Sequence, residues 1–100
     1  MAGLGKAARG KRRWIGIRIS KATESRKSCL TILSNQLSGI DWKMFDYKSN
    51  KSDTFAIIRV RLEDCEEAIS SLNESKLIET QTISGKIRLV RERMGLKKSG

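Results

Sequence analysis

The chain has 100 residues, which is enough for one domain with a single thin hydrophobic core. Apolar residues make up 38% of the sequence and charged residues 32%, a balance typical of a globular protein rather than a disordered one. The 21 Lys and Arg residues outnumber the 11 Asp and Glu residues, and the net charge of +10 favours a polyanionic partner.

The first predicted elements are a flexible arm and a strand. Residues 1–12 are rich in Gly, Ala, Lys and Arg without periodicity, which predicts an arm ahead of a single α+β RNA-binding domain over residues 13–100. Apolar side chains from Trp14 to Ile19 then alternate with the period of two of a strand that buries one face. Gly16, inside this strand, indicates a bulge or the close approach of another element.

A helix and a pair of strands are predicted next. From Thr23 the apolar period changes to that of a helix ending near Gly39, with the stripe Leu30, Leu33, Leu37 and Ile40. Residues 42–47 are again β-prone, residues 48–53 form a polar turn, and residues 55–60 are the strongest strand signal in the chain. Two strands around a short polar loop predict a hairpin.

The last part of the chain predicts a helix, a strand and a short basic helix. Apolar residues at helical spacing over residues 65–72 overlap an acidic turn at residues 63–67, where the helix dipole favours negative charge. We expect this turn to be solvated, with a contact to a basic partner protein as the alternative. Residues 77–84 predict a fourth strand ended by Gly85, and a third helix closed by Gly95 follows, with the stripe Ile87, Val90 and Met94.

The order of these elements predicts the fold class. Strand, helix, strand, strand, helix, strand is the split βαβ pattern of ferredoxin-like domains. We therefore predict an α+β fold: a ferredoxin-like or RRM-like four-stranded antiparallel sheet with helices packed on it, plus a basic C-terminal helix. Two helices would cover one face of the sheet, and the other face is either exposed or covered by the third helix.

The basic excess lies at the two ends of the sequence. Residues 1–13 hold five bases and no acid, and residues 85–100 hold six bases and one acid, which accounts for the whole net charge. Each Lys or Arg that meets a phosphate releases counterions and adds affinity. Membrane is a weaker candidate than nucleic acid, because no apolar stretch approaches the ~20 residues of a membrane helix. Without the apolar core of a signal peptide, a cytoplasmic protein is expected, or a nuclear one if the source is eukaryotic.

Basic residues on two predicted elements are the candidates for contact with RNA. Docking of the third helix through its stripe would leave Arg88, Arg91 and Lys98 toward solvent or a partner, although a charge run is usually a solvated face. With the basic arm and the arginines of the strongest strand, the candidate RNA-binding set is Lys11, Arg12, Arg13, Arg59, Arg61, Lys86, Arg88, Arg91 and Arg93.

The strongest strand is expected to place Arg59 and Arg61 on the same sheet face as Phe55 and Ile57. An aromatic ring and two guanidinium groups on one surface are suited to stacking bases and contacting phosphates. In the alternative, Phe55 is core and the arginines lie at the wet end of the strand. The full consensus of an ordinary RNA-recognition motif is absent, since no glycine precedes Phe55.

The remaining residue types argue against catalysis by this chain. With no histidine and only two isolated cysteines, Cys29 and Cys65, neither a metal site nor a cofactor is expected, and both thiols are expected in the core. No catalytic set is found, because there is no Gly-rich phosphate loop and no nucleophile with a base in register. Trp14 and Trp42 are expected to be core, or interface anchors if exposed.

Three segments together carry a family resemblance. In residues 12–19, basic residues precede an aromatic and alternating aliphatics; residues 56–60 form a strand with an arginine near its end; and residues 83–88 hold Ser-Gly leading into a basic helix. In order and spacing over roughly residues 12–94, they resemble ribonuclease P protein component 2, a family of protein subunits found in archaeal enzymes, with a eukaryotic nuclear counterpart.

The resemblance implies a non-catalytic subunit of an RNA-based endoribonuclease. In that enzyme the RNA subunit carries the catalytic metal ions, and this chain would bind and support it during removal of the tRNA 5′ leader. The implied partners are ribonuclease P RNA, precursor tRNA indirectly, and protein component 3, a barrel-like subunit, with other protein subunits as further candidates. Contacts with the RNA backbone are expected from Arg12, Arg13, Arg59, Lys86, Arg88 and Arg91.

Other interpretations remain open. A ribosomal or other ribonucleoprotein RNA-binding protein of the same fold shares every physical argument except the three-segment resemblance. A protein-interaction or regulatory domain would have basic ends that are incidental. An independent enzyme is the least supported, and it would have to turn over precursor tRNA without an RNA subunit.

Overall fold

The computed structural model describes residues 11–96. Most of the predicted arm over residues 1–12, together with Lys98, therefore lies outside the described residues. The elements in chain order are β1 (Arg12–Ile19), α2 (Arg26–Gln36), β2 (Trp42–Ser49), β3 (Thr54–Arg61), the 3-10 turn η1 (Leu62–Asp64), α3 (Cys65–Asn73), β4 (Ile78–Ser84) and α4 (Ile87–Met94). The predicted α+β class, with its four-stranded sheet and C-terminal helix, is confirmed, whereas the ferredoxin-like label stays a prediction.

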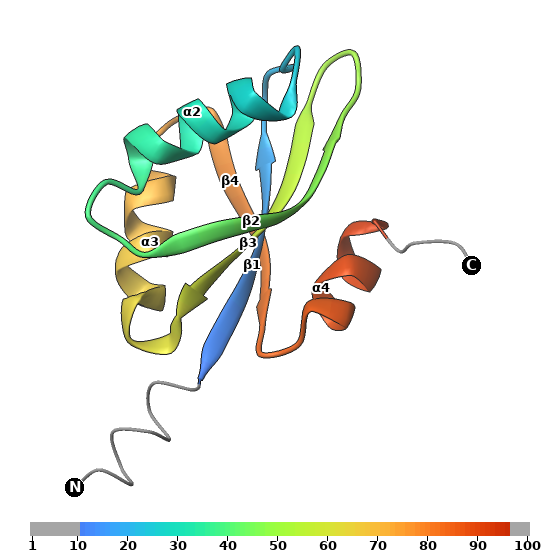
Figure 1. Cartoon of the computed structure of the whole chain (residues 1–100). Helices are drawn as coiled ribbons and strands as arrows, with labels where there is room; N and C mark the ends of the chain where they lie inside the picture. The colour runs from blue at the N-terminus through green and yellow to red at the C-terminus, as the bar shows by residue number, and fades with distance from the viewer. Residues whose placement is uncertain (1–10, 97–100) are drawn as a thin grey trace, which may run out of the picture.

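The four strands form one open antiparallel sheet in the order β2-β3-β1-β4. The predicted hairpin is the β2–β3 pair, and β1 lies inside the sheet between β3 and β4. Helices α2 and α3 lie on one side of the sheet, and α4 lies on the other (Figure 1). The face that the sequence left undecided is therefore the α4 side, and α4 contacts β4, β1 and β3 on it.

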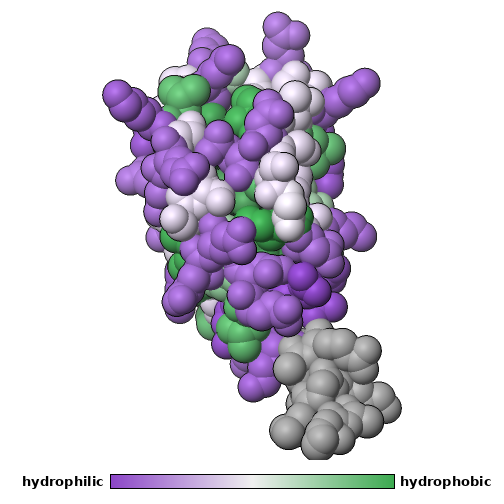
Figure 2. All heavy atoms as spheres, turned by 90° about the vertical axis from the view of Figure 1, so that its left-hand side faces the viewer, coloured by the Kyte–Doolittle hydropathy of each residue, from purple (hydrophilic) through white to green (hydrophobic). Residues whose placement is uncertain are grey.

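The main hydrophobic core lies between the sheet and helices α2 and α3. Alternate residues of β1 supply Ile15, Ile17 and Ile19, all with no exposed surface. Burial of each large aliphatic side chain contributes about 1.5–3 kcal/mol. Most of the buried apolar residues belong to this core, so it supplies most of the apolar burial of the fold. The outer surface over these helices is largely hydrophilic (Figure 2). The other members of the core include Leu33, Leu37, Met44, Ala56, Ile58, Val60, Ala68 and Leu72.

Helix α2 is shorter than its apolar spacing predicted. It begins after Ser25, whose Oγ accepts a hydrogen bond from the Ser28 N–H at 3.2 Å, and it ends at Gln36. The turn that follows contains Gly39 at φ 85°, a left-handed conformation that glycine adopts without steric cost. The buried position in the first half of the helix is Cys29 rather than Leu30, which is only partly buried against the core.

A second, smaller apolar contact holds α4 on the opposite face of the sheet. Val90 of α4 and Ile57 of β3 are fully buried there, and Gly16 of β1 lies opposite Ile57. A Cβ atom at residue 16 would lie 2.9 Å from Val90 Cγ1 and would also collide with Met94. The pairing of β1 with β4 also shifts register directly after Gly16, so both functions predicted for this glycine are present.

Candidate nucleic-acid interface

Two arginines of α4 fasten this helix to the sheet. The Arg91 guanidinium donates to the Asp46 carboxylate of β2, from Nε to Oδ2 at 2.6 Å and from Nη2 to Oδ1 at 2.9 Å. The hydrogen bond to Asp46 raises the pKa of Arg91 above its ordinary value. Arg93 Nη1 donates to Thr82 Oγ1 at 3.0 Å and to the Ile83 carbonyl at 3.2 Å.

This anchoring differs from the predicted orientation of Arg91 toward solvent or a partner. The guanidinium instead lies against the sheet, because a bidentate charge-assisted pair is the strongest contact open to it at that position. Arg88, one turn earlier, is exposed and has no hydrogen bond or ion pair with any described residue. The outward charge of α4 is therefore carried by Arg88 more than by Arg91.

Arg61 is also engaged within the fold. Its Nε donates to Asp64 Oδ2 at 3.0 Å, and Glu63 Oε2 lies 4.0 Å from its Nη1. This hydrogen bond and the two neighbouring acids raise the pKa of Arg61. β3 ends at Arg61, so its side chain turns toward the acidic residues of η1 rather than sharing a surface with Arg59 as predicted. Part of the acidic turn thus serves an internal pair.

Arg59, by contrast, lies among aromatic rings on the α4 side of the sheet. Its guanidinium carbon is 5.9 Å from the centre of the Trp14 ring and 5.1 Å from that of Phe45. The two rings meet edge to face with their centres 4.6 Å apart, and Lys43 Nζ is 5.5 Å from the Phe45 ring. We call Trp14, Lys43, Phe45 and Arg59 the aromatic–basic cluster.

Strand register brings the aromatic–basic cluster together. In antiparallel pairing, residues that lie opposite one another point to the same face. Arg59 of β3 lies opposite Trp14 of β1 on one side and opposite Lys43 of β2 on the other. Phe45 is the extra residue where the β2–β3 register shifts between Met44 and Asp46, and this irregularity allows its ring to reach Trp14.

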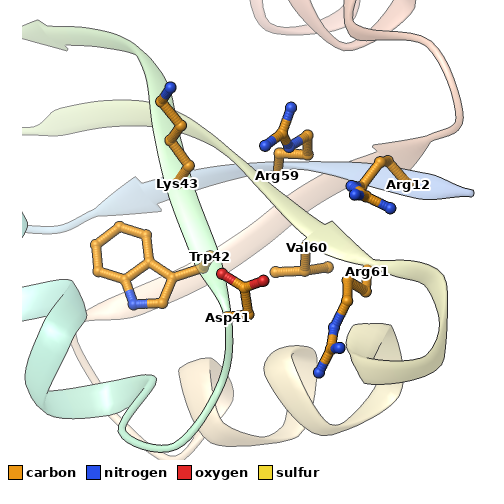
Figure 3. A pocket seen from close by; sticks show the side chains of 7 residues that line it. All are labelled: Arg12, Asp41, Trp42, Lys43, Arg59, Val60 and Arg61. Atoms are coloured by element: carbon orange, nitrogen blue, oxygen red, sulfur yellow. The ribbon is translucent and has the colours of Figure 1, made fainter. Parts of the chain in front are cut away.

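The cluster borders a hollow at the end of the sheet where β1 begins and β3 ends. Figure 3 shows Lys43 and Arg59 pointing to the α4 side, whereas Trp42 and Arg61 point to the opposite side. Four of the seven residues that line the hollow are basic and one is acidic, a composition that favours the binding of an anion. The lining residues are Arg12, Asp41, Trp42, Lys43, Arg59, Val60 and Arg61.

The positive charge on the sheet and α4 is only partly neutralised inside the protein. Arg18, Arg61 and Arg91 each pair with a carboxylate. Lys43 and Arg59 have no carboxylate partner among residues 11–96, and neither does Arg88. The described acids therefore neutralise the arginines that hold the fold together and leave the cluster charged.

The other predicted RNA-binding residues lie at or near the same end of the sheet. Lys11 and Lys86 are exposed, and Lys86 precedes α4. Arg12 is half-buried and donates to the Lys11 carbonyl at 3.2 Å, and Arg13 donates to the Arg12 carbonyl at 2.9 Å. The Arg13 guanidinium also lies beside Gly85.

Sequence reasoning assigned no role in binding to Phe45 or Lys43, two of the four residues of the cluster. Trp14 was expected in the core, or as an interface anchor if exposed, and it is half-buried on the α4 side; Trp42 does pack against the main core. Phe55 was the aromatic expected beside Arg59, but it lies opposite Arg18 near the other end of β3. In the alternating pattern of β1, Trp14 takes the face turned away from the main core. This was the one signal in the sequence for its placement.

The cysteines have the structural surroundings expected of core residues. Cys29 and Cys65 are both free and buried. Burial raises the pKa of the Cys29 thiol to about 11, with the charge of Arg26 acting in the opposite direction, and burial also raises the pKa of Cys65. Within residues 11–96, no three Cys, Asp or Glu side chains are grouped as metal ligands, and no helix there is long and apolar enough to cross a membrane.

Comparison of the chain with protein-family models, with curated proteins and with solved structures finds no match.

Proposed function

We propose that the protein is a non-catalytic RNA-binding subunit of ribonuclease P, in the cytoplasm or, in a eukaryotic source, the nucleus. It binds and supports the catalytic RNA during removal of the tRNA 5′ leader. Its other partners are protein component 3 and, through the RNA, precursor tRNA. The observation that carries the proposal is the aromatic–basic cluster, whose charge is left unpaired at one end of the sheet.

The charge that has no carboxylate partner supports RNA as the partner. Lys43 and Arg88 are exposed, Arg59 is half-exposed, and none of the three has a carboxylate partner among the described residues. Phosphate contacts by such side chains give affinity that depends strongly on salt. The resemblance of residues 12–19, 56–60 and 83–88 to component 2 adds the specific RNA and the reaction.

Loss of the protein in its native cell tests this function. Depletion is expected to cause precursor tRNAs with intact 5′ leaders to accumulate, as measured by mapping tRNA 5′ ends. Re-expression of the wild-type chain should restore mature ends, and Arg88→Glu should restore them poorly. Arg88 lies in the first turn of α4, where a negative charge is compatible with the helix dipole, so this variant should still fold.

Lys27→Glu is the matched control for charge reversal. Lys27 is exposed on α2, on the side of the sheet away from the cluster. It is expected to restore mature tRNA ends as well as the wild type does. Normal 5′ ends after complete depletion would contradict the proposal, and so would equal rescue by Arg88→Glu and Lys27→Glu.

A further inference from the structure

We propose that the aromatic–basic cluster binds an unpaired base of RNA, with the neighbouring phosphate on Lys43. This inference rests on the proposed RNA-binding function and deepens it. It assigns the cluster to single-stranded RNA. The phosphates of a duplex would instead be contacted by the exposed basic residues near the cluster, Lys86 and Arg88.

The chemistry of the cluster fits a base better than a phosphate alone. A site for phosphate needs only cations, whereas here the guanidinium of Arg59 lies over two aromatic rings. Aromatic rings and the planar guanidinium group are the surfaces on which unpaired bases stack in RNA-binding proteins. Trp14, Phe45 and Arg59 are each partly exposed, so some of the surface of each can be reached from solvent.

The position of the cluster also favours a single strand. Phe45 is next to Asp46, the residue that holds Arg91 of α4, so the cluster lies beside a fixed helix rather than on an open flat sheet. Lys43 is exposed at its edge and lies opposite Arg59. A base stacked at Arg59 would thus leave its own phosphate within the reach of a lysine side chain.

An acidic protein segment is the other class of partner that positive charge attracts. Such a segment would bind to cationic side chains and would gain little from an edge-to-face pair of rings with a guanidinium group over both. The arrangement in the structure therefore favours RNA, and an acidic peptide serves as a competitor in the test.

The test compares two RNA probes with the full-length protein. One is a short single-stranded oligoadenylate, and the other is an RNA duplex with the same total number of phosphates. Phe45→Leu removes a ring and keeps an apolar side chain, and Arg59→Lys keeps the charge and removes the planar group. Phe55→Leu is the matched control, because it removes a ring from the same strand as Arg59 but away from the cluster.

The expected result is selective loss of single-strand binding. Phe45→Leu and Arg59→Lys should weaken oligoadenylate binding by about fivefold to a hundredfold, the usual effect of losing one base stack, and duplex binding by less than about twofold. Phe55→Leu should match the wild type. In a Trp42→Phe background, the oligonucleotide should also quench the fluorescence of Trp14. Unchanged urea midpoints would show that each variant folds.

Other outcomes overturn the inference in distinguishable ways. If Phe45→Leu leaves both affinities unchanged or lowers both equally, the cluster does not stack bases, and the proposed RNA-binding function stands. If the wild type binds neither probe, both proposals fail. If polyglutamate displaces the oligoadenylate at equal charge concentration, the site recognises charge alone and base stacking is excluded.

Discussion

The Arg91–Asp46 pair should contribute measurably to stability, although most ion pairs at protein surfaces do not. Exposed pairs are worth about 0.2–1 kcal/mol, and removing one partner of a fully buried pair costs about 3–5 kcal/mol. The Arg91 and Asp46 side chains are 27% and 10% exposed, and two hydrogen bonds join them. We therefore expect a coupling energy between these limits, about 1–2 kcal/mol.

A double-mutant cycle measures this coupling. The free energies of unfolding of Asp46→Ala, Arg91→Ala and the double variant are determined in urea and compared with the wild type. The Arg18–Asp53 pair serves as the internal control, because it has a single hydrogen bond of 3.2 Å and side chains that are 37% and 20% exposed. We expect about 0.5 kcal/mol for that pair.

Equal coupling energies for the two pairs, or a value below about 0.3 kcal/mol for Arg91 and Asp46, would refute this reasoning. The docking of α4 would then rest on the apolar contact of Val90 and Met94 and on the hydrogen bonds of Arg93. The cycle also bears on RNA binding, since any loss of affinity in Arg91→Ala is expected to follow from loosening of α4 and to be reproduced by Asp46→Ala.

Three further predictions concern other parts of the fold. Gly16→Ala should lower the free energy of unfolding by roughly 1–3 kcal/mol in urea, because its Cβ would overlap Val90; an unchanged value would contradict the close approach of α4. Ser25→Ala should cost about 1 kcal/mol through loss of the bond from the Ser28 N–H, and Ser25→Asp should cost little. Above pH 9 the unfolded Cys29 thiol ionises while the folded one keeps its proton to about pH 11, so the free energy of unfolding should fall across this range. The fall should be less steep in Cys29→Ala, and an equal slope in both proteins would show that burial does not protect this thiol.

The fold was largely predictable because its elements have strong periodic patterns. The alternation of Ile15, Ile17 and Ile19 marked β1 and its buried face, and the spacing of Val90 and Met94 marked the docked side of α4. These patterns follow from local geometry, in which each strand or helix buries one face. Helix ends were less predictable, as the early end of α2 shows.

The aromatic–basic cluster was less predictable because it depends on register and on an irregular residue. Placing Trp14 opposite Arg59 requires the pairing of β1 with β3, which lie far apart in the sequence. No pattern in the sequence predicts the register shift that allows the Phe45 ring to reach Trp14. The pairing of Arg91 with Asp46 likewise requires knowing that α4 covers the second face of the sheet, and the sequence left open whether that face is exposed or covered.

Sequencing of the RNA that co-purifies with the tagged protein from its native cell tests the central proposal most directly. Moderate salt in the washes removes weak phosphate binding. Enrichment of one ribonuclease P RNA with the wild-type protein, and its loss in a Lys43→Gln, Arg88→Gln variant, is the predicted result. Enrichment of ribosomal RNA would instead assign the protein to another ribonucleoprotein, and the absence of any specific RNA would contradict RNA binding itself.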